Sequence, residues 1–423
     1  METLRRYLRA LTTFSPNARR YLAMTALLGV GTSFQWLFFN LYVLSLGFDQ
    51  AFVGLLAGIP ALVTAVSALP IGLLLPRFGY RRGLLAGSLL YVSAFVGWAL
   101  FPVASVLIAG GVLAGLGSSL LFITSSPLMV AVSTERNRTQ LFGVQFGLNT
   151  LVGVLANLVG GYLPRVFAGA FGFAVESPIA YRAVLLVAMA LAISAIVPIA
   201  RLRGLAGNRH DRVVGFGLIS GHWRTFVKLL AVQLTVALGA GMLMPFVNVF
   251  YKLRFDLPDP SLGVVFSISS LLTGLSAFAA PLIADRIGKV RTIVVTQALS
   301  LPFLVAMGFA PWFGASAAGF LIRTALMNMS APVFMAFTMG LVPGELRPLT
   351  SSLLTLAWNA GWAISSAFSG WIQVSVGFWP LFIITGSIYA VVVLLTYLLF
   401  RNAQELSEPE IIEKLHVDEE ERV

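Results

Sequence analysis

The sequence predicts an all-α membrane protein with twelve transmembrane helices in two six-helix pseudo-repeats. Three observations lead to this fold class. The 423 residues are 58% hydrophobic and only 11% charged, with a mean hydropathy of +0.89, far above the range of soluble domains. The apolar residues gather in long runs, and landmark residues of the first half of the chain recur in the second half. We therefore expect a lipid bilayer to surround most of the chain.

The long apolar runs define the predicted spans. A helix of about 20 residues crosses a hydrocarbon core of roughly 30 Å. Breaks in the hydropathy pattern separate twelve runs of sufficient length, near 21–46, 51–75, 83–103, 105–132, 140–163, 181–200, 226–251, 261–284, 291–311, 314–342, 350–375 and 378–400. The basic stretch before the first run has no apolar core, so we interpret it as a cytoplasmic segment and not as a signal peptide.

Matched landmarks indicate a duplication of six spans in parallel orientation. The matches, at offsets of 208 to 210 residues, are Asn40 with Asn248, Arg77 with Arg286, Gly79 with Gly288, Glu135 with Glu345, Asn149 with Asn359 and Gly160 with Gly370. The predicted domains are an N-terminal half at 1–200, a cytoplasmic linker at 201–225, a C-terminal half at 226–401 and an acidic cytoplasmic tail at 402–423.

The basic residues are distributed by loop. Of the 28 Lys and Arg residues, 23 fall in the termini, the linker and the loops on one side of the predicted membrane. Four fall in the alternate loops, and Arg323 alone lies inside a span. The positive-inside rule then places both termini in the cytoplasm and makes the number of spans even. We expect the membrane to be the inner (cytoplasmic) membrane of the cell. Since topology accounts for the net charge of +11, we expect no nucleic-acid partner.

Residue types that support catalysis or metal binding are scarce. The chain has no cysteine, and its three histidines lie outside the predicted spans. It contains no phosphate-binding loop, no zinc-type cluster of His and Glu, and no nucleophile with a base. We therefore predict no enzymatic activity, no metal site and no cofactor.

Two similar loops follow the second span of each half: GLLLPRFGYRR at 72–82 and PLIADRIGKVR at 281–291. Their pattern resembles the signature of the major facilitator superfamily. Two departures stand out, because Pro281 replaces the usual glycine of the second loop and Pro76 occupies the position of the family's aspartate in the first. The resemblance implies twelve spans in two halves that rock about a central substrate site.

The resemblance also implies a conformational latch, in which the loops close the cytoplasmic side of the outward-facing state. Asp285 is expected to pair with a neighbouring helix end or with Arg347. The candidate latch residues are Arg77, Gly79, Arg81, Asp285, Arg286, Gly288, Arg291 and Arg347. The alternative is that the loops only anchor the topology.

Polar and aromatic residues on the spans that line the family's cavity are the substrate-site candidates. They are Gln35, Trp36, Asn40, Gln145, Asn149, Asn248, Arg323, Trp358, Asn359 and Trp362. Each amide can bond a substrate hydroxyl or carbonyl, but asparagine also joins helices to one another. Arg323, near the outer end of its span, has two interpretations: it faces the cavity and attracts an anionic or carbonyl-bearing substrate, or it reaches to the membrane surface.

All 17 acidic residues fall in loops, span ends or termini, so no carboxylate is expected at mid-membrane. If protons drive transport, Asp49 or Asp256 at the outer mouth is the candidate coupling group.

Together with these patterns, the resemblance implies a secondary transporter, expected as a monomer, whose partners are a small-molecule substrate and the lipid bilayer. Efflux of a hydrophobic or amphipathic compound suits aromatic and amide-bearing candidates without an acid. The alternatives are uptake or exchange of a sugar-like or anionic metabolite, and a membrane sensor that has lost transport.

Overall fold

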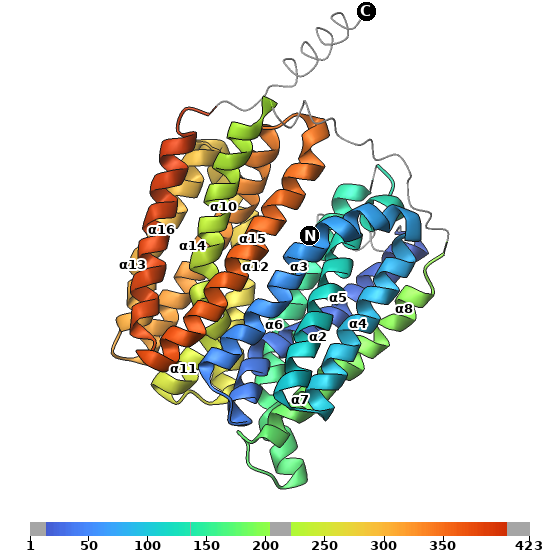
Figure 1. Cartoon of the computed structure of the whole chain (residues 1–423), viewed down its shortest axis with the longest axis vertical. Helices are drawn as coiled ribbons and strands as arrows, with labels where there is room; N and C mark the ends of the chain where they lie inside the picture. Colours follow the sequence, from blue (N-terminus) through green and yellow to red (C-terminus); the bar gives the residue numbers. More distant parts are fainter. Residues whose placement is uncertain (1–13, 136, 204–220, 404–423) are drawn as a thin grey trace, which may run out of the picture.

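The computed structural model describes residues 14–135, 137–203 and 221–403, and nearly all of them are helical. The side chains of residues 73, 76 and 77 are also outside the described part. Most of the predicted linker and tail, and the side chain of the latch candidate Arg77, therefore lie outside the described residues. Figure 1 shows two helical bundles side by side, α10 to α16 on the left and α2 to α8 on the right.

The N-terminal half contains α2 (Pro16–Ser45), α3 (Gln50–Phe78), α4 (Tyr80–Leu100), α5 (Ala104–Val132), α6 (Arg138–Phe171), α7 (Pro178–Ser194) and α8 (Ile196–Ala200). Three of these helices have a side chain that caps the N-terminus. Ser15, Asp49 and Ser177 each accept a hydrogen bond from a backbone N–H of the first turn of α2, α3 and α7, which satisfies one of the free donors there. The run predicted at 181–200 is interrupted at Ala195, between α7 and α8.

The C-terminal half contains α10 (Trp223–Leu243), the short 3-10 helix η1 (Met244–Phe246), α11 (Val247–Phe255), α12 (Asp259–Ile287), α13 (Lys289–Phe309), α14 (Phe313–Gly340), the 3-10 helix η2 (Gly344–Leu346), α15 (Arg347–Ser375) and α16 (Trp379–Phe400). The predicted span at 226–251 is present, but it is divided into α10 and α11, because Pro245 lies at the break between them. Proline has no N–H for the helical ladder and its ring crowds the preceding turn.

Eleven helices or helix pairs in the described ranges are long and apolar enough to cross a membrane. The remaining predicted span, at 350–375, corresponds to α15, which has 29 residues but a more polar composition than these eleven require. It packs against α3 of the other half and against α10. Because α15 is surrounded by protein along these faces, it needs less apolar surface than a helix that faces lipid.

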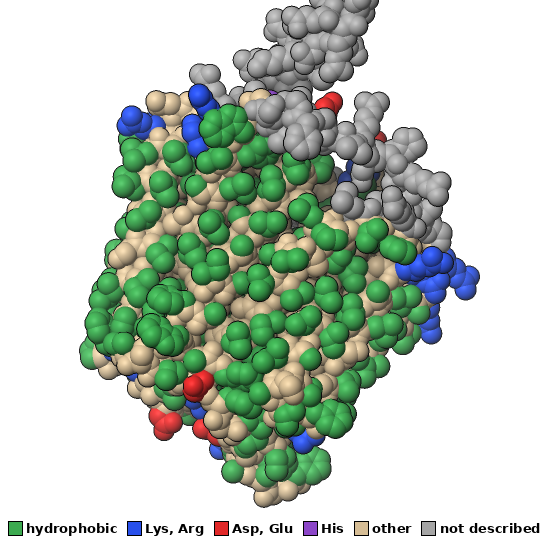
Figure 2. All heavy atoms as spheres, in the orientation of Figure 1, with side chains coloured by type: hydrophobic (Ala, Val, Ile, Leu, Met, Phe, Trp, Pro, Cys, Tyr) green, Lys and Arg blue, Asp and Glu red, His purple; other side chains and the backbone are tan. Residues whose placement is uncertain are grey.

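The ends of the bundle differ in charge. We call the end where α2 begins and α16 ends the connector end, and the opposite end the distal end. At the connector end, Asn17 Nδ2 donates to the carbonyl of Arg203 (2.8 Å) and Arg81 Nη2 to the carbonyl of Ala200 (2.7 Å). Figure 2 shows hydrophobic side chains across the middle of one face. Blue Lys and Arg side chains stand out at its top and right edges, where a little red is also visible, and red acidic side chains lie beside some blue ones near the bottom.

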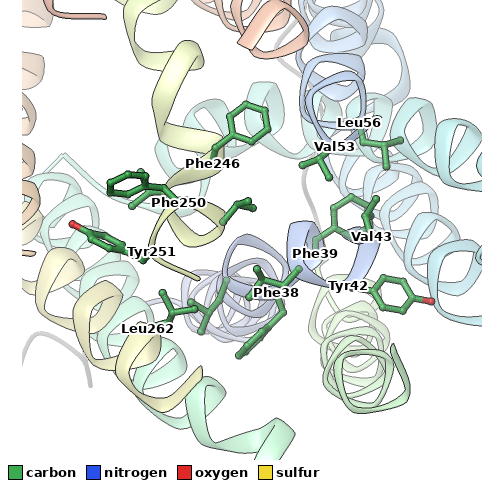
Figure 3. Packing of buried hydrophobic residues seen from close by; sticks show 14 of the residues in the cluster. Phe38, Phe39, Tyr42, Val43, Val53, Leu56, Phe246, Phe250, Tyr251 and Leu262 are labelled. Atoms are coloured by element: carbon green, nitrogen blue, oxygen red, sulfur yellow. The ribbon is translucent and has the colours of Figure 1, made fainter. Parts of the chain in front are cut away.

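One hydrophobic core joins the two halves at the distal end. Phe39, Val43 and Val53 of the N-terminal half belong to the same buried cluster as Phe246 and Phe250 of the C-terminal half (Figure 3). The buried clusters near the connector end each belong to one half: one is built from α2 and α4 to α8, and others from α10 to α16. The described structure is therefore closed at the distal end, and we call this joint the distal closure.

Glycine pairs allow the helices of the two halves to approach closely at the distal closure. A Cβ atom on Gly54 of α3 would lie 2.5 Å from the carbonyl oxygen of Ser366 on α15. A Cβ atom on Gly263 of α12 would lie 2.6 Å from the carbonyl oxygen of Asn157 on α6. Gly54 and Gly263 are 209 residues apart, so the two contacts are equivalent under the duplication. Only glycine fits at these backbone-to-backbone contacts.

Candidate functional site

A cavity of about 450 Å³ lies between the two halves, on the connector side of the distal closure. Its lining includes Gln35, Trp36, Phe39, Asn40, Pro60, Thr64, Tyr91, Trp98, Ser118, Pro245, Trp358, Asn359 and Trp362. Residues of α2 to α5 thus face residues of η1 and α15. None of the described lining residues is Asp, Glu, Lys or Arg. We call this space the central cavity.

Tryptophans from both halves meet at the central cavity. The ring centroids of Trp36 and Trp362 are 6.0 Å apart in an edge-to-face arrangement, and those of Trp358 and Trp362 are also 6.0 Å apart. Trp36 is 56% exposed. Indole rings held this way offer large apolar surfaces with N–H groups at their edges. The cavity is therefore suited to an apolar or aromatic solute.

Two predicted amides that line the central cavity, Gln35 and Asn359, have partners within their own half. Gln35 accepts a hydrogen bond from the hydroxyl of Tyr91, and Asn359 Nδ2 donates to the carbonyl of Thr355 on its own helix (2.9 Å). The Asn359 side chain retains its carbonyl oxygen as an acceptor for a solute.

Asn40 and Asn248 make reciprocal bonds across the distal closure. Asn40 Nδ2 donates to the carbonyl of Pro245, and Asn248 Nδ2 donates to the carbonyl of Leu37 (2.9 Å). Asn40 thus bonds the carbonyl three residues before Asn248, and Asn248 bonds the carbonyl three residues before Asn40. Asn40 also lines the central cavity, but Asn248 is buried, only 1% exposed, and lines neither cavity described here. The expectation that Asn248 faces the cavity is corrected: its amide is used to join the halves.

Gln145 and Asn149 on α6 are not among the residues that line the two cavities described here. Gln145 Nε2 donates to the hydroxyl of Tyr21 on α2 (2.8 Å), and Asn149 is exposed. The structure therefore does not bring these two candidates together with the tryptophans.

A second cavity, of about 440 Å³, lies inside the C-terminal half and contains Arg323. Its lining also includes Gln233, Met244, Gln297, Thr324, Asn328, Phe334, Trp358, Trp362 and Tyr389. Trp358 and Trp362 line both cavities. We call this space the Arg323 cavity.

Arg323 is not at the membrane surface. It is ten residues from the start of α14, about 15 Å at 1.5 Å per residue, and only 2% exposed. The guanidinium packs against the ring of Tyr389, 5.3 Å from Cζ to the centroid, with the hydroxyl of Tyr389 near it. The expectation that Arg323 lies near the outer end of its span is wrong, and the surface-reaching alternative fails with it.

Several lining residues were missed by sequence reasoning. Tyr91 and Trp98 face the central cavity, and Gln297 and Tyr389 face the Arg323 cavity. A glutamine inside an apolar span is a signal that could have identified Gln297, because polar groups are costly there. The aromatic residues give no such signal, since aromatic residues are also common in lipid-facing positions.

Ion pairs link the halves at the distal end. Lys252 pairs with Glu176 of the N-terminal half and with Asp259 of its own half (2.9 Å). The hydroxyl of Tyr181 on α7 also donates to Asp259 (3.3 Å). The coupling candidates Asp49 and Asp256 are exposed at this end and line neither cavity.

The candidate latch residues lie at the connector end. Gly79 and Gly288 adopt the same backbone conformation, with φ of 81° and 89°, in the turns between α3 and α4 and between α12 and α13. This positive φ explains why glycine recurs there. Arg286 and Arg291 are exposed.

The expected partnership of Asp285 with Arg347 is not formed. Arg347 Nε instead donates to the carbonyl of Met339 (3.1 Å), and Asp285 is exposed, without an ion pair among the described residues. A latch that closes the connector end is expected to be open when the distal end is closed.

Comparisons with known proteins place the chain in a family. The sequence model of the Major Facilitator Superfamily matches residues 21–228 and 229–418. No curated protein sequence matches the chain. Among solved structures, a bacterial homologue of the human lysosomal transporter Spinster, in an inward-facing and unoccupied conformation, has a TM-score of 0.75 at 14% identity, covering 91% of this chain and 97% of that one.

Two further structures share the fold. The nucleoside transporter NupG has a TM-score of 0.72 at 11% identity, covering 92% of this chain and 100% of the other. A bacterial homologue of the iron transporter ferroportin, in an inward-facing state, has a TM-score of 0.67 at 15% identity, covering 90% and 97%. The chain belongs to the Major Facilitator Superfamily and is therefore a membrane transporter that works by alternating access, not an enzyme.

Proposed function

We propose that this transporter moves a small hydrophobic or amphipathic organic compound out of the cell. The observation that carries the proposal is the central cavity, where tryptophans of both halves face each other and no charged residue is among the described lining residues. Such a lining favours an apolar solute, which gains about 25 cal/mol for each Å² of apolar surface removed from water. The similar structures named above carry diverse substrates, so the proposal rests on this cavity.

The proposed orientation places the connector end in the cytoplasm. Support comes from the loop distribution of Lys and Arg in the sequence and from their position at the connector end of the structure. In this orientation the described state is closed to the outside, so the central cavity receives solute from the cytoplasmic side. The signature loops then act as a cytoplasmic latch that closes in the opposite state. We propose a monomer, because each half finds its partner surfaces within the same chain.

The central cavity can be tested by transport into reconstituted vesicles. We expect Trp362→Ala to weaken the transport of aromatic amphiphiles about 10- to 100-fold, because removing an indole surface costs about 1.5–3 kcal/mol. Initial rates for a panel of such compounds, with and without a pH gradient, are the measurement. Trp371→Ala is the matched control, since Trp371 lies on the same helix, is 60% exposed and lines neither cavity. Equal losses in both variants would contradict the proposed site.

Orientation can be tested with single cysteines, because the chain contains none. We expect Asn402→Cys, at the connector end, to react with an impermeant maleimide only after cells are opened. Ala174→Cys, in the exposed distal loop between α6 and α7, should react in intact cells. The reverse pattern would overturn the proposed orientation.

A further inference from the structure

The Arg323 cavity contains a buried cation whose hydrogen-bonding groups are mostly unused. Nη1 of Arg323 contacts the sulfur of Met244 at 3.6 Å, a weak acceptor. Nε and Nη2 have no hydrogen-bond partner, although both atoms are shielded from solvent. Within the described ranges, no carboxylate pairs with Arg323 and no acidic residue lines its cavity. A buried arginine in this condition costs several kcal/mol, which a structural role does not repay.

The geometry of the unpaired N–H groups of Arg323 indicates which chemical group on a ligand would neutralise its charge. Nε–H and the Nη2–H groups lie along one edge of the planar guanidinium and donate in parallel, which matches the two oxygens of a carboxylate. Tyr389 lies against the guanidinium, with Cζ of Arg323 5.3 Å from the centroid of its ring and its hydroxyl near the group. The donors that remain without a partner are those of the edge formed by Nε and Nη2. The hydroxyl of Thr324, the next residue on α14, is also buried without a partner and lines the same cavity.

The remaining lining of the Arg323 cavity combines uncharged polar residues, Gln233, Gln297, Asn328 and Ser330, with apolar and aromatic ones. Phe334 and Met327 contribute to its lining, and Trp358 and Trp362 connect it to the central cavity. A ligand with a carboxylate at Arg323 can therefore extend an aromatic body towards the tryptophans. A neutral or cationic ligand of the same size would leave the guanidinium unpaired or would be repelled by it.

We propose that the Arg323 cavity is an anion-binding subsite that selects solutes with a planar carboxylate next to an aromatic or apolar body. This inference rests on the proposed transport function and narrows its substrate class to amphipathic carboxylates. Arg323 Nε and Nη2 hold the two carboxylate oxygens, Thr324 donates a further hydrogen bond, and Trp358 and Trp362 hold the apolar body.

Binding of three matched probes to the purified full-length protein tests the subsite. The probes are 2-naphthoate, 2-naphthamide and 2-naphthylmethylammonium, which share a ring system and differ in charge. Thermal stabilisation is measured in a detergent that contains no anionic lipid, because a ligand that binds only the folded state raises the melting temperature. We expect naphthoate to bind at least about tenfold more tightly than the amide, as for a charge-assisted hydrogen-bonded pair, and the ammonium to bind most weakly.

Two variants identify the group responsible. Arg323→Gln should lose the preference for naphthoate and, without any probe, should melt at the same or a higher temperature, since a buried unpaired charge has been removed. Arg323→Lys, which keeps a charge but not the parallel donors, should retain part of the preference. A structural arginine would instead give a lower melting temperature in Arg323→Gln and no change in probe preference.

Failure of this inference differs from failure of the proposed function. Equal stabilisation by the three probes, none by naphthoate, or an unchanged preference in Arg323→Gln would overturn the anion subsite. Stabilisation by the neutral 2-naphthamide that is lost in Trp362→Ala would still support the tryptophan-lined site of the proposed function.

Discussion

Replacing Gly54 or Gly263 by alanine is expected to abolish most transport. The added methyl group would lie 2.5 Å from the carbonyl oxygen of Ser366 in one case and 2.6 Å from that of Asn157 in the other. Both neighbours are backbone atoms of long helices, so the halves must separate to make room. Overpacking of this kind costs about 1–3 kcal/mol per site, and the cost falls only on states in which the distal end is closed.

The readout for these variants is the initial rate of transport together with the distance between the halves. We expect a loss of tenfold or more in rate for each variant, and a distal end that stays open. Spin labels on cysteines at Val103 and Trp312, exposed positions in the distal loops of the two halves, report that distance. Gly169→Ala on α6 is the control, because a Cβ atom there has no neighbour within 4 Å. If Gly54→Ala transports as well as Gly169→Ala, the close approach of α3 and α15 is not required for transport.

The second large effect is expected from the double variant Asn40→Ala with Asn248→Ala. Its two lost bonds, to the carbonyls of Pro245 and Leu37, connect the halves only at the distal end. Hydrogen bonds between membrane helices contribute about 0.6–1.7 kcal/mol each. The double variant should therefore shift the equilibrium between the two states towards the outward-open form by roughly 10- to 100-fold.

The same spin-label distances measure the populations of the two states. Each single variant should give about half of the free-energy shift, because the two bonds are equivalent under the duplication. Asn359→Ala is the matched control: it removes an amide whose bond stays within its own helix, to Thr355. A double variant that keeps the wild-type distance distribution would show that the bonds are incidental to the closure.

The sequence by itself determined the span pattern and the duplication, because hydrocarbon thickness and repeated landmarks act through composition and spacing alone. The resemblance to the family pointed to Trp36, Trp358 and Trp362, which do line the central cavity; their contact with substrate stays a prediction. Gly79 and Gly288 were found for a local reason, a turn with positive φ that favours glycine. Each of these features can be recognised from the order and spacing of residues along the chain, without knowing which helices pack together.

Only the tertiary structure decided which polar groups already have partners. Asn40, Asn248 and Asn359 read alike in the sequence, yet two of them join the halves and one bonds within its own helix. The reason is that an amide's role depends on which carbonyl another helix brings within about 3 Å, and helix rotation and crossing decide this. The same holds for Arg323, whose unpaired edge follows from the helices packed around it.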